Sequence, residues 1–187
     1  GFQELDDVAA IAEMSKGAGV LFERVATMPM PVVALVEGAA MAGGLGIVCA
    51  CDLVAVEPGA KFALSEVTLG IPPAQIAPFV VARLGLREAK KLMLTAARFD
   101  GARAGEIGLA DAVSDELEAY EMEVRKAVMR CAPGANAVTK DIVLACGRLS
   151  GDAMRDYAAA GFADCLAGEG REGVAAFLEK RKPAWAE

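Results

Sequence analysis

Apolar residues recur with a helical period at the start of the chain and again throughout its last third. Residues 5–27 carry apolar side chains three or four positions apart among charged ones, which predicts a single helix. The same period returns from residue 116 onward and predicts four more helices: 116–131, 135–148, 151–167 and 171–181. The pattern therefore indicates a helical C-terminal region with a boundary near residue 115.

Between these helices, short apolar runs alternate with glycine and proline. Three runs predict buried strands: 31–36, 52–56 and 61–64. Residues 44–50 are rich in small side chains and predict a tightly packed helix, and 69–73 predict an irregular loop. Further helices are expected near 76–84, 87–95 and 102–107. The alternation indicates an α/β part over residues 1–115, followed by a helical part over 116–187.

The composition excludes several kinds of chemistry. The 187 residues include 19 Lys and Arg, 26 Asp and Glu, no His and five Cys, with a net charge of −7. Without a basic block, a nucleic-acid surface is not expected. Without His there is no Ser-His-Asp or Cys-His nucleophile and no His-ligated zinc. The Cys form no C-x-x-C pair, so free thiols in a reducing compartment are expected, and neither a disulfide frame nor a metal site.

One segment superficially resembles a membrane span. From Val25 to Cys51 the only charged residue is Glu37, but Pro29 and Pro31 interrupt the segment and four glycines follow. A buried strand and a buried helix explain this segment better than a span does. No secretory signal opens the chain, so a cytoplasmic location and no membrane association are expected. The absence of an initiator Met indicates that the natural start is missing.

The glycine-rich segment 38–46 is the first candidate for function. No Gly-Lys-Ser/Thr follows it, and no third glycine completes a dinucleotide-binding fingerprint. Taken alone, its small residues fit tight packing of a helix on a strand. The alternative is that a glycine turn before a helix presents free backbone N–H groups, which stabilise an oxyanion without a charged side chain.

Three other places carry candidate side chains. Glu66 follows an apolar strand and precedes a Pro-rich loop, which suits either a desolvated acid/base group or a solvated strand end. Asp52 is expected to be structural, bonding to neighbouring backbone. Segment 177–182 is basic and contains an aromatic residue. Its positive charges either interact favourably with the C-terminal end of the helix dipole or bind a phosphate-bearing ligand.

The order of these segments resembles the enoyl-CoA hydratase/isomerase (crotonase) family. The segments that carry the resemblance are 31–38, 40–46, 51–52, 61–66, 69–72, 94–111 and 172–182. The resemblance implies a crotonase-like spiral of ββα turns with an α-helical C-terminal region. It also implies homotrimers or dimers of trimers, and acyl-CoA thioester substrates of the kind met in fatty acid metabolism.

The resemblance assigns roles to particular residues. The backbone N–H of Gly43 is expected to be one oxyanion donor, and Glu66 to be the catalytic acid/base. The second donor belongs to an earlier strand, so the N-terminal part of the fold is expected to be missing from this sequence. Six residues are expected to bind substrate: Met41, Gly44, Pro72, Ala74, Phe177 and Lys180. Phe177 and Lys180 match positions that reach the CoA of a neighbouring subunit, and no cofactor other than the substrate's own CoA is implied.

The sequence departs from the two-glutamate pattern of many hydratases in the family. The first of those glutamates aligns with Gly46, whereas the second aligns with Glu66. Relatives with a single glutamate at this position include hydratases of branched glutaconyl-CoA thioesters, which residues 64–78 resemble most. They also include Δ3,Δ2-enoyl-CoA isomerases, which are the alternative. A non-catalytic crotonase-like subunit is the second alternative.

Overall fold

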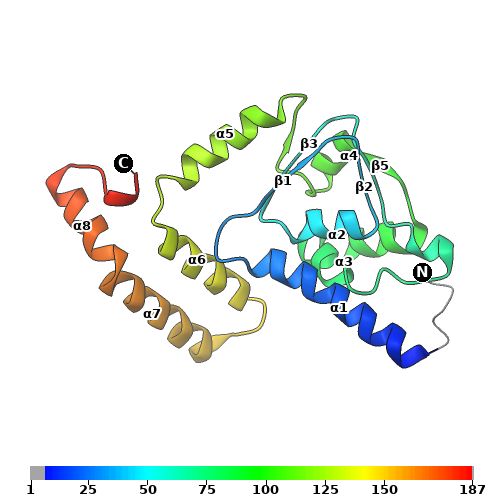
Figure 1. Ribbon diagram of the computed structural model, residues 1–187, viewed down its shortest axis with the longest axis horizontal. Coiled ribbons are helices and arrows are strands. Elements are labelled where there is room, and N and C mark those ends of the chain that lie inside the picture. The colour runs from blue at the N-terminus through cyan, green and yellow to red at the C-terminus, as the bar shows by residue number, and fades with distance from the viewer. Residues whose placement is uncertain (1–6, 187) are drawn as a thin grey trace. The chain divides into compact units, whose positions relative to one another are not determined.

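The computed structural model describes residues 7–186, which form two compact units (Figure 1). Of the described residues, unit 1 comprises 7–26 and 32–120, and unit 2 comprises 27–31 and 121–186. The division falls within helix α5 (Leu117–Val128), whereas the sequence prediction put a boundary near residue 115. The first predicted helix is α1 (Val8–Thr27), and residues 5 and 6 of that prediction lie outside the described residues.

Unit 1 repeats a strand-strand-helix pattern. The first turn contains β1 (Val33–Val36), β2 (Ala39–Met41) and α2 (Gly43–Ala50). The second contains β3 (Leu53–Val56), β4 (Lys61–Ala63), the 3₁₀ helix η2 (Glu66–Leu69) and α3 (Ala77–Thr95). A shorter third turn contains β5 (Phe99–Asp100), α4 (Gly101–Glu106) and β6 (Ala112–Val113).

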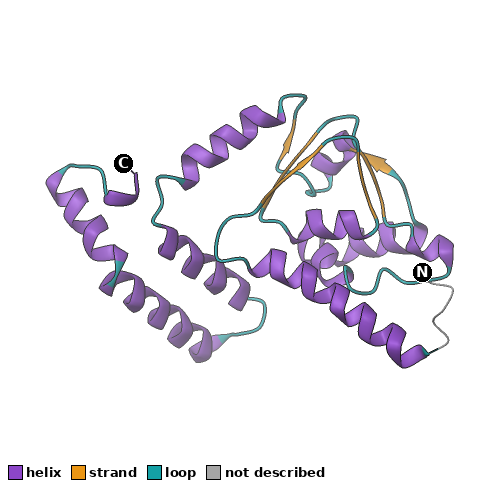
Figure 2. Cartoon of the chain, in the orientation of Figure 1, coloured by secondary structure: helices purple, strands orange, loops and turns teal. Residues whose placement is uncertain are grey.

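Each turn contributes one strand to each of two small sheets, which is the geometry of a spiral (Figure 2). In the first sheet, of order β1-β3-β6, both pairings are parallel. In the second, of order β2-β4-β5, β2 and β4 are parallel and β5 is antiparallel to β4. Equivalent positions of successive turns are therefore brought side by side.

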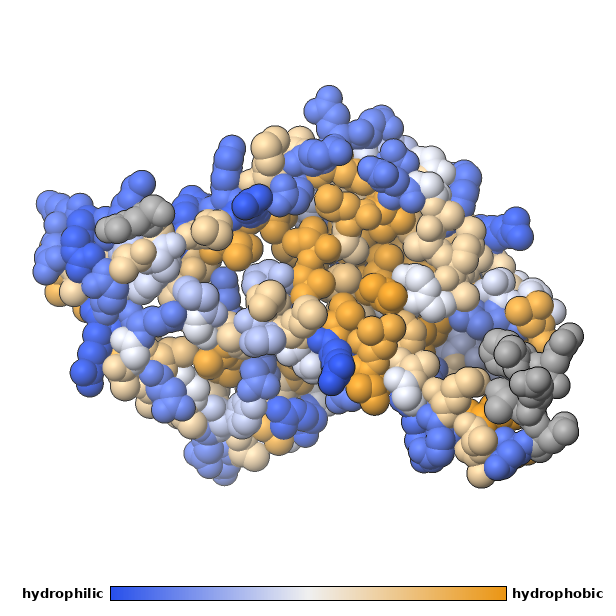
Figure 3. Space-filling view, viewed as in Figure 1, coloured by the Kyte–Doolittle hydropathy of each residue, from blue (hydrophilic) through white to orange (hydrophobic). Residues whose placement is uncertain are grey.

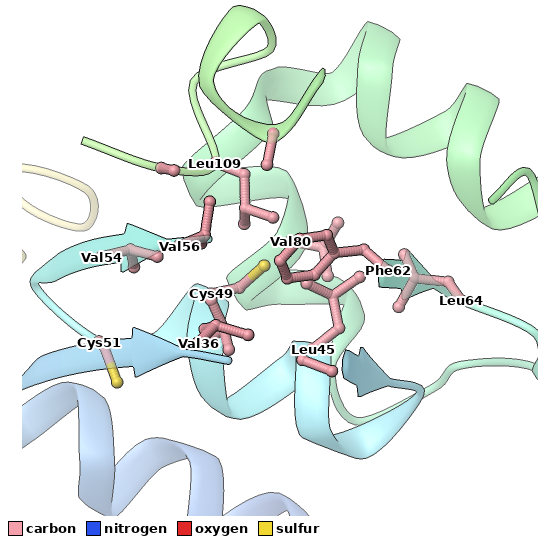
Figure 4. Packing of buried hydrophobic residues seen from close by; sticks show 14 of the residues in the cluster. Val36, Leu45, Cys49, Cys51, Val54, Val56, Phe62, Leu64, Val80 and Leu109 are labelled. Atoms are coloured by element: carbon pink, nitrogen blue, oxygen red, sulfur yellow. The ribbon is translucent and has the colours of Figure 1, made fainter. Parts of the chain in front are cut away.

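The core of unit 1 lies between the sheets and the helices α2 and α3 (Figure 4). Its largest fully buried side chains are Leu45, Val54, Val56, Phe62, Leu64, Val80 and Leu109. Phe62 stacks on Phe99 with ring centroids 5.3 Å apart. This packing fixes the strand β4, which precedes Glu66, and the helix α2, which begins at Gly43.

Arg83 of α3 joins two loops of unit 1, the one between α2 and β3 and the one between α4 and β6. Its guanidinium donates to the backbone oxygens of Cys51, Asp52 and Leu109 at 3.0, 3.3 and 2.9 Å. It also pairs with the Asp111 carboxylate at 2.8 Å, and its side chain is only 12% exposed. The Asp52 carboxylate accepts the N–H of Val32 at 2.7 Å, in line with the structural role expected for it.

We expect Arg83→Met to destabilise the protein by about 3 kcal/mol, because three backbone oxygens lose their side-chain donor and Asp111 loses its cationic partner, keeping the N–H of Val54. The free energy of unfolding in urea measures this loss. Arg87→Met, at an exposed position of the same helix, is the control and is expected to change stability by about 0.5 kcal/mol or less. An equal effect of the two variants would contradict the role of Arg83.

Unit 2 consists of packed helices and a C-terminal segment. After α5 come α6 (Pro133–Ala145), α7 (Gly151–Ala167), α8 (Glu169–Glu179) and a final 3₁₀ turn, η3 (Ala184–Ala186). The Glu169 carboxylate accepts the N–H of Ala135 at 3.2 Å, so it caps the positive end of α6. The Trp185 indole donates to the backbone oxygen of Arg130 at 3.3 Å, which joins η3 to the turn that follows α5.

Many apolar side chains reach the molecular surface (Figure 3). In unit 2, Phe177, Leu178 and Phe162 are 82%, 73% and 68% exposed, and α7 buries none of its residues completely. Among the described residues, no helix combines the length and the apolar character that a bilayer span requires.

Candidate active site

The glycine turn joins β2 to α2 and exposes backbone amides. The N–H of Ala42 donates to the backbone oxygen of Ala63 at 2.9 Å, so the turn is fixed to β4. Helix α2 begins at Gly43, which is half-buried, and Gly44 is exposed. The first amides of a helix have no acceptor within the helix, and the helix dipole adds positive potential there. The N–H groups of Gly43 and Gly44 are thus suited to bind a carbonyl oxygen that gains negative charge.

Glu66 begins the 3₁₀ helix η2, three residues after β4 ends. Its Oε2 atom is buried and has no hydrogen-bond partner among the described residues. A buried carboxylate oxygen without a donor is unfavourable for the fold, and groups of this kind cluster at functional sites. The backbone of η2 is held in place, because the Thr68 hydroxyl donates to the backbone oxygen of Ser65 at 2.7 Å and the N–H of Ile71 donates to the backbone oxygen of Glu66 at 3.3 Å.

Strand pairing brings the glycine turn and Glu66 to one edge of the sheet. Strands β2 and β4 are parallel, and Met41 is paired with Ala63 at their carboxyl ends. Gly43 follows Met41 by two residues, and Glu66 follows Ala63 by three. Because neighbouring strands lie about 4.8 Å apart, the two segments leave the sheet at the same edge. Free amides and a carboxylate together suit polarisation of a carbonyl and transfer of a proton.

Gly46 is closed off by apolar side chains. A β-carbon at Gly46 would lie 2.3 Å from Cγ2 of Ile76 and 3.2 Å from Cε1 of Phe22. Phe22 of α1 in turn packs against Phe79 of α3, with ring centroids 6.0 Å apart. The space beside Gly46 is therefore filled, and no side chain at this position can supply a second carboxylate.

The other residues with expected binding roles divide between the two units. Met41 ends β2 beside the glycine turn and is 38% exposed, and Pro72 and Ala74 are exposed in the loop after η2. Phe177 and Lys180 are exposed at the end of α8 in unit 2, where Lys180 ends the helix in a left-handed conformation. Unit 1 thus brings together Met41, Gly43, Gly44 and Glu66.

Two features of the site lie outside what local sequence patterns reveal. The loop that follows Glu66 is tied to α1, because the Gln75 amide donates to the Ser15 hydroxyl at 3.1 Å. Gly19 permits this contact, since a β-carbon there would lie 2.5 Å from Oε1 of Gln75. The closure of Gly46 by Phe22 and Ile76 is the second feature. Both join residues 24 or more positions apart, and no local motif marks them.

The thiol next to the site is not a candidate nucleophile. Burial raises the pKa of the Cys49 thiol to about 12, so the sulfur stays protonated near neutral pH. Nor do the described residues contain a cluster of three His, Cys, Asp or Glu side chains that could hold a metal ion. The chemistry that these residues can support is therefore that of backbone amides and one carboxylate.

Comparisons with known proteins show which family the chain resembles. The sequence profile of the enoyl-CoA hydratase/isomerase family matches residues 3–187. The solved structure of Pseudomonas aeruginosa AtuE superposes with a TM-score of 0.92 at 45% identity, covering 97% of this chain and 72% of AtuE. A structure described as an enoyl-CoA hydratase/isomerase from Marinobacter aquaeolei gives 0.89 at 39% identity, covering 94% of this chain and 68% of that one.

The chain is also similar, at lower sequence identity, to a curated protein whose name states a function. The mevalonyl-coenzyme A hydratase sidH of Aspergillus fumigatus is 34% identical over 83% of this chain, which spans 60% of the length of sidH. The chain thus spans well under two thirds of that relative and about 70% of the two solved structures.

Proposed function

The chain belongs to the enoyl-CoA hydratase/isomerase family, and from that premise we propose that it is a hydratase-type lyase of acyl-CoA thioesters. It adds water across the 2,3 double bond of a 2-enoyl-CoA, or removes water in the reverse direction. The name of the Aspergillus relative, a CoA hydratase, supports this reaction class. The substrate's CoA is the only cofactor that the proposal requires.

The observation that carries the proposal is the buried, unpartnered Oε2 of Glu66 beside the free amides of the Gly43 turn. The thioester oxygen gains negative charge as a nucleophile attacks C3, and the N–H of Gly43 stabilises that charge. Glu66 accepts a proton from water as the water oxygen bonds to C3. A proton then returns to C2, where the enolate collapses, so one molecule of water is added in total.

The finer proposal is a 3-branched glutaconyl-CoA as substrate. Its support is the single carboxylate: Gly46 has no side chain, and Ile76 occupies the space that one would need. Glu66 must therefore serve both the oxygen at C3 and the proton at C2. This arrangement matches the single-glutamate hydratases that residues 64–78 resemble.

The same geometry supports one alternative reaction. A single carboxylate beside an oxyanion donor can move a proton between C2 and C4, which is the reaction of a Δ3,Δ2-enoyl-CoA isomerase. The name of the Marinobacter structure includes both activities. The third alternative is a crotonase-like subunit without activity. The buried Oε2 of Glu66 argues against this alternative, because burying it without a hydrogen bond lowers stability and serves no structural contact.

Self-association is part of the proposal. The exposed apolar side chains of unit 2, with Phe177 at 82% exposure, are suited to be covered by another subunit in a homotrimer or a dimer of trimers. In such an assembly, Phe177 and Lys180 contact the adenine and phosphates of a neighbour's CoA. We place the protein in the cytoplasm and in acyl-CoA metabolism of the fatty acid type.

A single assay separates these reactions. Full-length protein is supplied with a 3-branched glutaconyl-CoA, an unbranched 2-enoyl-CoA and a 3-enoyl-CoA in H₂¹⁸O, and the products are analysed by mass spectrometry. The proposal predicts ¹⁸O at C3 with the branched substrate turned over fastest. Migration of the double bond without ¹⁸O would favour the isomerase, and calorimetric CoA binding without any turnover would favour a non-catalytic subunit.

A further inference from the structure

Three residues other than glycine have a positive φ among the described residues: Ala42, Ala96 and Lys180. Ala96 (φ 49°, ψ 31°) and Lys180 (φ 55°, ψ 36°) end α3 and α8 in the ordinary left-handed conformation. Ala42 has the same φ of 49° but a ψ of −122°. Those angles are typical of the first central residue of a type II′ turn, where glycine is strongly preferred. An alanine there is strained.

The backbone conformation of Ala42, although strained, sets the direction of the next peptide group. The oxygen of Ala42 accepts the N–H of Gly46 at 3.0 Å, so this carbonyl points along α2. In a trans peptide the C=O and the following N–H point in opposite directions. The N–H of Gly43 therefore points out of the helix, toward the space that a ligand of the turn would occupy.

A flip of the peptide between residues 42 and 43 would remove this donor. Rotating ψ of Ala42 by roughly half a turn, with the opposite rotation of φ at Gly43, brings Ala42 to the left-handed conformation of Ala96 and Lys180. Glycine tolerates this change of φ because it has no β-carbon. The bond from the N–H of Ala42 to Ala63 does not depend on that rotation. The flip relieves strain but breaks the hydrogen bond from Gly46 and turns the N–H of Gly43 into the helix. The turn can therefore adopt two peptide orientations: a strained one with the N–H of Gly43 directed outward, and a relaxed one with this N–H directed into the helix.

We propose that Ala42 is a positioning residue, whose strained backbone sets the fraction of molecules in which the Gly43 amide faces the thioester oxygen. The inference rests on the proposed function, because it concerns the donor of that site. Residue 42 then acts on the rate of the chemical step more than on substrate binding, since the oxyanion forms only in the transition state.

Two substitutions at residue 42 shift the turn in opposite directions. Ala42→Gly removes the steric strain of the observed conformation, so the amide stays directed outward and kcat is retained or raised. Ala42→Asn favours the left-handed conformation, which asparagine adopts more readily than other residues with a β-carbon. The flipped peptide then predominates, and kcat falls by up to about 10²–10³-fold, as for loss of one oxyanion donor, with KM little changed.

The matched controls are Ala96→Gly and Ala96→Asn, at a half-buried alanine with the same φ at the end of α3. Both are expected to change the melting temperature without changing kcat. Crystal structures of the residue-42 variants give the second measurement: ψ near −120° in Ala42→Gly and near +50° in Ala42→Asn. An Ala42→Asn protein that keeps ψ near −120°, or that is flipped and keeps the parent kcat, would overturn the inference.

The design separates this inference from the proposed function. If the parent protein turns over no acyl-CoA, the proposed function fails, and the ψ angles in the crystals still show whether residue 42 controls the peptide. If the parent is active and kcat is independent of the orientation of that peptide, the inference alone fails.

Discussion

Glu66→Gln is expected to lower kcat by about 10²–10⁴-fold and to leave the fold intact. Glutamine has the same shape but cannot accept a proton from water, so general acid/base help is lost. Oε2 of Glu66 has no hydrogen-bond partner among the described residues, so the substitution breaks no bond to that atom. Initial rates with the best acyl-CoA substrate measure kcat, and thermal unfolding measures stability.

The control for this variant is Glu37→Gln, which neutralises an exposed carboxylate between β1 and β2. It is expected to change neither kcat nor the melting temperature appreciably. A Glu66→Gln protein with undiminished turnover would remove Glu66 from the mechanism. Loss of activity together with loss of the folded state would show a structural role instead.

Gly46→Glu is expected to destabilise the protein and to leave it without a gain in hydratase activity. The new β-carbon would overlap Cγ2 and Cβ of Ile76, which are too near the backbone to move aside easily. Overpacking of this kind costs about 1–3 kcal/mol, and a desolvated carboxylate adds to that cost. Denaturant unfolding measures the stability, and the hydration assay measures the activity.

Gly44→Ala supplies the comparison for stability. Gly44 lies on the same helix, and a β-carbon added there would meet no atom within 4 Å. The substitution is therefore expected to be neutral or to stabilise α2 by up to about 1 kcal/mol. The double variant Gly46→Glu with Ile76→Ala is expected to recover part of the lost stability, because it frees the overlapping volume. A Gly46→Glu protein as stable as the parent, or one that hydrates faster, would contradict the closure of this position by Ile76.

Much of the architecture follows from local patterns. The helices of the C-terminal region and the strands 31–36, 52–56 and 61–64 predicted from apolar runs correspond to observed elements. The two helices predicted at 76–84 and 87–95 are halves of α3, divided at Gly85, whose φ of 73° and ψ of 161° are not helical. The ββα spiral expected from the family resemblance is also confirmed.

Other parts depend on contacts between distant residues. Strand β2 lies within segment 38–46, which was interpreted only as a turn, and β5 and β6 have two residues each. Strands this short show no periodicity and form because β3 and β4 offer them partners. Glu66 and the glycine turn could be named from the sequence, but the closure of Gly46 and the ψ of Ala42 could not.

The central claim is that the Gly43 amide and the Glu66 carboxylate act on one acyl thioester. A crystal structure of the full-length protein with butyryl-CoA, a saturated thioester that cannot be hydrated, tests it most directly. The account predicts the thioester oxygen about 2.7–3.1 Å from the nitrogen of Gly43, with Glu66 facing C2 and C3 of the acyl chain. A thioester oxygen directed away from Gly43, or an acyl chain bound away from Glu66, would contradict it.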